Sequence, residues 1–280
     1  MFNEVQNEKI KTVAENFCNT YFNCWKKAVN NEEGIAKYKC IKDTKTSERK
    51  PTGALKGWTD FHMKKILYKL AEGLTFEKND KPECYKKKEC EDITIHCHKC
   101  SCKTECGYGE SWQKEYYKVD LLLSEYQLDS NSNAGKWCND FYIEHENAHF
   151  KLYKNDANKV QQNGWFGEFN KLLPLNTSDD GMRVIISYDD FDMIKEKKTF
   201  LENHLNDSNS LTQKSIVKQP ILVILAPSNK AINIGEDNWC FHILLFTFDN
   251  EWKCDYEKPY ADEVIKNIFE QIKNVKSTAN

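Results

Sequence analysis

Apolar side chains recur along the first part of the chain with the spacing of one helical face. From residue 4 to residue 29 they return every three or four positions, which predicts an amphipathic helix. Residues 58–74 repeat this spacing and predict a second helix. Between them, residues 30–57 are polar and contain Pro51 and glycines, so they predict loop.

From residue 116 onward the pattern changes to apolar runs that alternate with helical spacing. The apolar and β-branched runs predict strands at 116–126, 141–146, 182–188, 221–225 and 239–248. The helical spacing predicts helices at 165–173, 191–205 and 261–275, the first of which ends before Pro174. Alternating strands and helices are typical of an α/β fold with a mixed central sheet. We therefore expect an N-terminal helical region at 1–57 and an α/β domain at 58–280.

Composition and charge limit the cellular compartments and the classes of binding partner that are expected for this chain. The formal net charge of the 280 residues is -3, so a nucleic-acid partner would require a locally basic face. The sequence has no apolar run of about 18 residues, the length that a membrane-spanning helix needs. Residues 1–10 are polar and lack the apolar segment of a signal peptide. We expect an intracellular, cytoplasmic protein with no membrane association.

Two carboxylates lie one residue apart on the strand predicted at 141–146. Because residues i and i+2 of a strand point to the same face, Glu144 and Glu146 would lie side by side. This arrangement is unfavourable unless a cation or a donor lies between them, although such pairs also occur on solvated sheet faces. Asp120 opens the preceding apolar run, and adjacent strands are ~4.8 Å apart, so all three carboxylates can converge on one ion. Their oxygen ligands suit Mg²⁺ or Mn²⁺.

Asp120 followed by Glu144-x-Glu146 resembles the motif of the PD-(D/E)XK nuclease superfamily. The resemblance covers residues 110–190 and includes the order of elements: a helix, an acid-bearing strand, the acid-x-acid strand, a helix and a β-branched strand. It implies the restriction-endonuclease-like fold and a metal-dependent hydrolase that cleaves phosphodiester bonds, with DNA as the expected substrate. It also implies that Asp120 and Glu144 ligate the metal, and it is compatible with a homodimer.

The chain departs from the family at Glu146, where most members have a lysine. Two hypotheses follow: either Glu146 acts as a general base or second-metal ligand, or Lys171 of the next helix supplies the missing cation. Glu168 lies one turn before Lys171 on the same helix face and would support the metal ligands. The simpler alternative is an ion pair between Glu168 and Lys171. A non-catalytic protein that binds nucleic acid or protein on the same fold remains the alternative to a nuclease.

Cysteines and lysines are concentrated at 80–107, where apolar residues are few. A segment without apolar residues needs a cross-link or a metal to become ordered. Cys97-x-x-Cys100 has the spacing of a tetrahedral zinc site, which either Cys84 and Cys90 or Cys102 and Cys106 would complete. We favour Cys84 and Cys90 as the second pair. Lysines of this insertion could then contact a phosphate backbone. The alternative use is disulfides, as in a secreted disulfide-rich protein. The cysteines outside this segment are expected to be buried thiols: Cys18, Cys24, Cys40, Cys138, Cys240 and Cys254.

Overall fold

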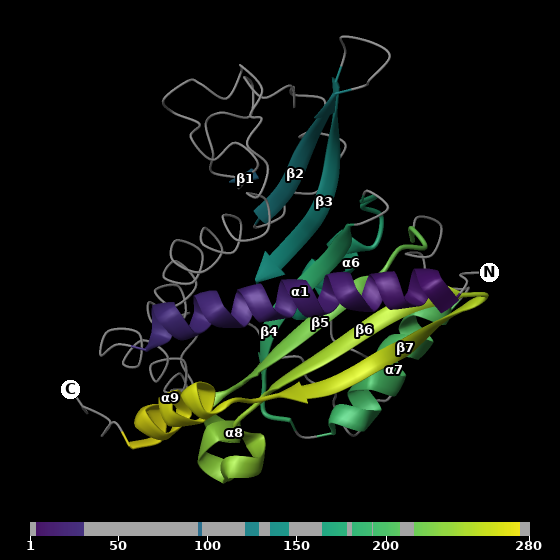
Figure 1. Ribbon diagram of the computed structural model, residues 1–280. Helices are drawn as coiled ribbons and strands as arrows, with labels where there is room; N and C mark the ends of the chain where they lie inside the picture. Colours follow the sequence, from purple (N-terminus) through teal and green to yellow (C-terminus); the bar gives the residue numbers. More distant parts are fainter. Residues whose placement is uncertain are drawn as a thin grey trace.

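The protein is a mixed α/β structure with one mixed sheet and helices on both of its faces (Figure 1). The computed structural model describes residues 4–30, 95–96, 121–128, 135–145, 164–177, 181–191, 193–207 and 216–274. Within them the sheet has seven strands. This architecture confirms the expected α/β class with a mixed sheet flanked by helices.

The structure describes seven strands, five α-helices and one 3₁₀ helix among these residues. The strands are β1 Ile95–His96, β2 Leu121–Leu128, β3 Gly135–His145, β4 Met182–Asp189, β5 Ile221–Pro227, β6 Phe241–Asp249 and β7 Glu251–Tyr260. The helices are α1 Glu4–Val29, α6 Gly164–Leu172, α7 Ile194–Asn206, α8 Asn229–Ile234 and α9 Glu263–Asn274, with a 3₁₀ helix at Glu236–Asn238.

The seven strands lie in the sheet in the same order as in the chain. The central strands β3, β4 and β5 are parallel, and the other neighbouring pairs are antiparallel. Parallel neighbours need a crossover connection, which α6 provides between β3 and β4 and α7 between β4 and β5. The carboxyl ends of β3, β4 and β5 therefore lie at the same edge of the sheet.

One face of the sheet is covered by α1, α8 and α9 (Figure 1). The apolar side of α1, which the sequence pattern predicts, packs into this core through Phe17, Phe22 and Trp25. The Trp25 ring lies edge-on to Phe241 of β6, with 5.0 Å between centroids, and 5.4 Å from Phe269 of α9. The N-terminal helix thus shares a core with the sheet, while the predicted boundary at residue 57 lies outside the described residues.

The opposite face is covered by α6 and α7. Trp165, Phe169 and Leu172 follow one another at helical spacing, and all three are fully buried. Trp165 and Phe169 stack with 5.2 Å between ring centroids. Together with Leu201 and Leu205 of α7, they form the second core, which fixes α6 over β3 and β4.

Strand β7 is one edge of the sheet, and side chains of α7 pair with part of its outer backbone. Asn206 donates its Nδ2–H to the Trp252 carbonyl at 2.8 Å and accepts the Trp252 N–H at 2.7 Å. The Cys254 N–H donates to Glu202 Oε1 at 2.9 Å. Free backbone groups on an edge strand invite pairing with other chains, so these side chains protect the edge.

Several predicted boundaries are wrong for identifiable reasons. Helix α7 begins at Ile194 instead of residue 191, because Phe191 and Met193 have φ of 60° and 56°, in the left-handed region that a right-handed helix excludes. Strand β3 begins at Gly135, earlier than expected, because its first half pairs with β2 in a hairpin. Strand β7 and helix α8 were not predicted. The helix predicted at 58–74 lies outside the described residues.

Candidate functional site

Glu144 is the penultimate residue of β3 and is held inside the sheet. Its exposed fraction is only 2%. Because side chains alternate along a strand, Glu144 shares a face with Tyr142, which belongs to the core beneath α6. A buried carboxylate is costly unless a cation or hydrogen-bond donors compensate it. The position of Glu144 therefore calls for a positive partner on the α6 side.

Lys171 of α6 provides that partner. Its Nζ lies 3.1 Å from Glu144 Oε1 and also forms an ion pair with Glu168, three residues earlier on the same helix. The Lys171 and Glu168 side chains are each 28% exposed, so the cluster extends from the buried strand to the surface. Three of the residues singled out in the sequence, Glu144, Glu168 and Lys171, are thus brought together.

The charge of Lys171 is set by these two carboxylates. Partial burial lowers the pKa of Lys171, but the hydrogen bonds and charges of Glu168 and Glu144 outweigh it and raise the pKa above its usual value. Lys171 is therefore an ammonium ion at neutral pH. In this state it can stabilise or orient a negative group, but it cannot accept a proton as a general base.

His145 follows Glu144 and lies on the opposite face of the strand. It is 4% exposed and packs edge-on against Tyr188 of β4, with 5.9 Å between ring centroids. Burial lowers the pKa of His145 from 6.5 to about 4, so the ring is neutral at pH 7. His145 belongs to the packing of the sheet on the α1 side, away from Lys171.

The buried His145 predicts a loss of stability in mild acid. Its folded pKa is lowered, so between pH 6.5 and 4 the unfolded chain binds more protons and stability falls as pH falls. For His145 alone we expect about 2 kcal/mol less free energy of unfolding at about pH 5 than at about pH 7.5. Urea unfolding at both pH values measures this difference.

The variant His145→Phe isolates this contribution, because its ring can pack in the same place without titrating. Burial also lowers the pKa of His204 and of His242, so part of the dependence of the free energy of unfolding on pH will persist in the variant. A His145→Phe protein with the full wild-type dependence on pH would contradict the assignment.

The other predicted site residues lie outside the described residues: Asp120, Glu146, Cys84, Cys90, Cys97 and Cys100. Asp120 directly precedes Leu121, the first residue of β2, and Glu146 directly follows His145, the last residue of β3. Among the residues that the structure describes, no group of three or more His, Cys, Asp or Glu is placed to hold a metal ion.

The described cysteines outside the Cys-rich segment behave largely as expected. Cys18, Cys24, Cys240 and Cys254 are free thiols, of which Cys18 and Cys240 are buried and the other two half-buried. Burial raises the pKa of Cys240 to about 11 and that of Cys254 to about 12. Neutral thiols of this kind are weak nucleophiles, so neither Cys240 nor Cys254 is a candidate catalytic group.

Sequence reasoning missed Arg183, which anchors the end of α6. Its side chain is fully buried. The guanidinium donates Nη1–H to the carbonyls of Leu173 and Leu172, at 2.5 and 3.4 Å. It donates Nη2–H to the carbonyl of Val217, at 2.8 Å, and to that of Gln219. Burial lowers the pKa of Arg183 to about 9, so it stays charged at pH 7. An arginine inside the β-branched run 182–188 is the signal that would have marked it.

A buried ion pair fixes the connection between β4 and α7. Lys197 Nζ lies 2.5 Å from Asp189 Oδ1, and the two side chains are only 3% and 1% exposed. Asp189 Oδ1 also accepts the Phe191 N–H at 3.0 Å. This pair holds the loop in which Phe191 and Met193 adopt positive φ.

Comparisons with known proteins give no match. No protein-family model matches the chain, no curated protein matches it, and no solved structure matches its fold. In the described part of the chain, no helix combines the length and the apolar character needed to cross a membrane. A functional assignment must therefore rest on the residues and the geometry of the chain itself.

Proposed function

We propose that the chain is a metal-dependent nuclease with a restriction-endonuclease-like core, which hydrolyses phosphodiester bonds in DNA. The observation that carries this proposal is the buried carboxylate of Glu144 at the carboxyl end of a central strand, 3.1 Å from a lysine of the next helix. Ligands of α/β sheets bind outside the carboxyl ends of the strands, which is where Glu144 lies.

The order of the described elements supports the proposal. An antiparallel hairpin of β2 and β3 is followed by α6 and by β4, which pairs in parallel with β3. The resemblance implies the same succession: an acid-bearing strand, an acid-x-acid strand, a helix and a β-branched strand. The crossover α6 places its polar side beside the end of β3, so a helix residue can contribute to a site on that strand.

The register of β2 with β3 supports a role for the remaining acids. Leu121 pairs with Ile143, so continuing the ladder by one residue would place Asp120 opposite Glu144. Directly opposite residues of antiparallel strands have Cβ atoms about 4.5–5.5 Å apart. Continuing β3 by one residue would put Glu146 on the same face as Glu144. We propose that these three carboxylates hold Mg²⁺ or Mn²⁺.

The donor set fits such an ion. All proposed ligands are carboxylate oxygens, which hard divalent cations prefer. The ammonium of Lys171 already lies between Glu144 and Glu168, so this region of the fold accepts positive charge between carboxylates. A bound ion would supply a hydroxide nucleophile at neutral pH and stabilise the leaving oxygen.

In this proposal Lys171 replaces the lysine that the family motif has at the position of Glu146. Its raised pKa keeps it protonated, so it would orient a phosphate oxygen or the attacking water by its charge. Glu168 would hold the ammonium in place from the same helix. The proposal extends to the Cys-rich segment 80–107, with Cys84, Cys90, Cys97 and Cys100 as zinc ligands, and to a homodimer.

A cleavage assay tests the proposal. Supercoiled and linear DNA are incubated with Mg²⁺ or Mn²⁺ and the wild-type protein, Glu144→Gln, Lys171→Met or the control Glu270→Gln. Glu270 is an exposed carboxylate on α9. We expect Glu144→Gln and Lys171→Met each to lower the cleavage rate by about a hundredfold or more. The control should cleave at the wild-type rate. A folded wild-type protein that cleaves neither DNA nor single-stranded RNA would rule out the proposal.

A second candidate function is a non-catalytic binding protein on the same fold. The contact that favours it is the Lys171–Glu144 pair itself, because it satisfies the buried carboxylate without a metal. Thermal unfolding with and without Mn²⁺ separates the two functions. A ligand that binds the folded state raises the unfolding temperature, so a nuclease site predicts a shift that Glu144→Gln removes. A binding protein with a purely structural ion pair predicts no shift.

A further inference from the structure

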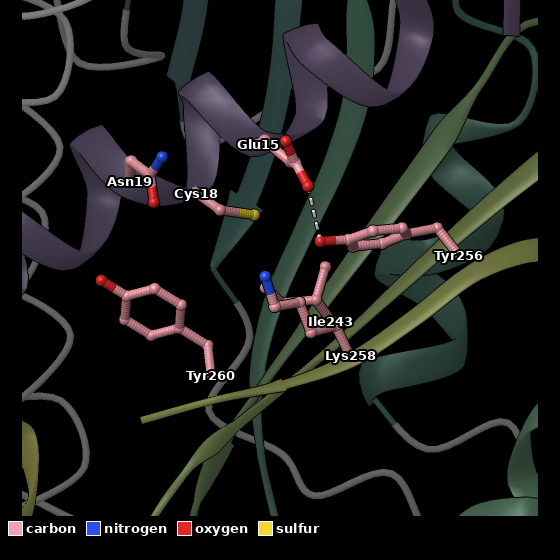
Figure 2. Close-up of a pocket in the computed structure, with 7 residues that line it drawn as sticks. All are labelled: Glu15, Cys18, Asn19, Ile243, Tyr256, Lys258 and Tyr260. Carbon is pink, nitrogen blue, oxygen red and sulfur yellow. Dashed lines mark hydrogen bonds between the residues drawn. The ribbon is translucent and has the colours of Figure 1, made fainter. Parts of the chain in front are cut away.

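A polar cavity lies between α1 and the β6–β7 hairpin, on the opposite face of the sheet from Lys171. Its volume is about 120 Å³. The residues that line it are Glu15, Cys18 and Asn19 of α1, Ile243 of β6, and Tyr256, Lys258 and Tyr260 of β7 (Figure 2). It thus combines one carboxylate, one ammonium group, one amide and two phenols around a small space.

The carboxylate of this cavity is held in a fixed position. The Tyr256 hydroxyl donates to Glu15 Oε1 at 2.9 Å, from the strand to the helix (Figure 2). Burial, and then the hydrogen bond to Glu15, raise the pKa of Tyr256 to about 12, so the phenol remains a donor at neutral pH. One oxygen of Glu15 is thereby used, and the other stays available to a cationic group.

The donors of the cavity have no partner among the described residues. The side chains of Lys258 and Asn19, which are exposed to solvent, and the Tyr260 hydroxyl form no hydrogen bond or ion pair with the residues that the structure describes. The Tyr260 ring is nevertheless fixed, because it stacks on Phe22 with 4.0 Å between centroids. Figure 2 shows the Lys258 amine directed toward the space beside Cys18.

We propose that this cavity binds a small zwitterionic α-amino acid. The ligand carboxylate would accept hydrogen bonds from Lys258, Asn19 and Tyr260, and its ammonium group would donate to Glu15. A simple anion would be repelled by Glu15 and a simple cation by Lys258, whereas a ligand with both charges satisfies both. Cys18 and Ile243 form the apolar part of the wall, which suits a short side chain such as that of alanine.

This site is independent of the proposed nuclease function. Its residues come from α1, β6 and β7, whereas Glu144 and Lys171 face the core beneath α6. No bond is made or broken in the cavity, so binding alone defines the activity. A failure of either proposal leaves the other untouched.

Calorimetric titration of the full chain tests the proposal with three probes of similar size. Alanine carries both charges, acetate only the carboxylate and ethylamine only the ammonium. The variants are Glu15→Gln, which can still accept the Tyr256 hydrogen bond, and Lys258→Met. The control is Lys266→Met, since Lys266 is half exposed on α9 and away from the cavity. Circular dichroism of each variant establishes that it is folded.

We expect alanine to bind, and each of Glu15→Gln and Lys258→Met to weaken its affinity about tenfold or more, the effect of losing a hydrogen bond to a charged group. Lys266→Met should bind like the wild type. Acetate and ethylamine should each bind at least about tenfold more weakly than alanine. Three results would overturn the proposal: no alanine binding up to about 10 mM, wild-type affinity for alanine in either Glu15→Gln or Lys258→Met, or acetate binding as tightly as alanine.

Discussion

Replacing Arg183 with methionine will lower the free energy of unfolding by about 4 kcal/mol, because it removes a buried charged donor from four carbonyls. Among these four, the backbone carbonyl of Gln219 depends most on the Arg183 guanidinium. The carbonyls of Leu172, Leu173 and Val217 each keep a backbone partner, which moderates the loss. Denaturant unfolding of wild type and variant measures the change through the midpoint concentration.

The effect of Arg183 depends on its shape as well as on its charge. Arg183→Lys keeps a positive charge but has no planar fork to reach carbonyls on both sides, so we expect it to recover less than half of the loss. Lys195→Met, at an exposed position of α7, provides the control. If Arg183→Met unfolded at the wild-type denaturant concentration, the guanidinium would have no anchoring role. The prediction matters for the site, since Arg183 fixes the end of the helix that carries Lys171.

Breaking the buried ion pair of Asp189 and Lys197 is the second change with a large expected effect. Lys197→Met leaves the Asp189 carboxylate buried without its cation, and we expect a loss of about 3–5 kcal/mol in the free energy of unfolding. Asp189→Asn leaves the Lys197 ammonium buried without its carboxylate, and we expect a loss of similar size in the free energy of unfolding. Both single losses are much larger than those of exposed pairs such as Lys253–Glu251.

A double-mutant cycle distinguishes the pair from its separate side chains. The double variant Asp189→Asn/Lys197→Met removes both charges, so its loss should be smaller than the sum of the single losses by about 1–3 kcal/mol. Glu251→Gln/Lys253→Met on the surface provides the matched cycle, with an expected coupling below about 1 kcal/mol. Strictly additive losses for the buried pair would show that the two side chains do not interact.

The sequence predicts the elements whose side chains face a core on a regular period. Helix α1 has the predicted bounds because its apolar positions repeat at helical spacing, and β4 and β5 appear as apolar runs because helices cover both faces of the central sheet. Strand β7 was missed for the opposite reason. It is an edge strand with charged residues from Glu251 to Lys258 and with Pro259, a composition that protects edges and lowers apparent strand propensity.

The candidate site was accessible from the sequence only in part. One of the hypotheses drawn from the sequence had Lys171 reach the end of the acid-bearing strand, and the structure places its Nζ 3.1 Å from Glu144. The catalytic role of these residues stays a prediction. The contacts of Arg183 and the Asp189–Lys197 ion pair could not be predicted, because each joins residues on different elements and local sequence spacing does not show which elements meet. The cavity under α1 was also hidden, since three of its lining residues belong to the missed strand β7.

The agreement between strand order and chain order has a consequence for synthesis of the protein. Each strand from β2 to β7 finds its neighbour already made, so the sheet can grow in the direction of translation with short loop closures. Helix α1 is the exception, because its aromatic residues pack on Phe241 and Phe269, more than two hundred residues later. The apolar side of α1 is therefore made long before its cover is complete, and it is a surface that chaperones would have to protect until α9 is made.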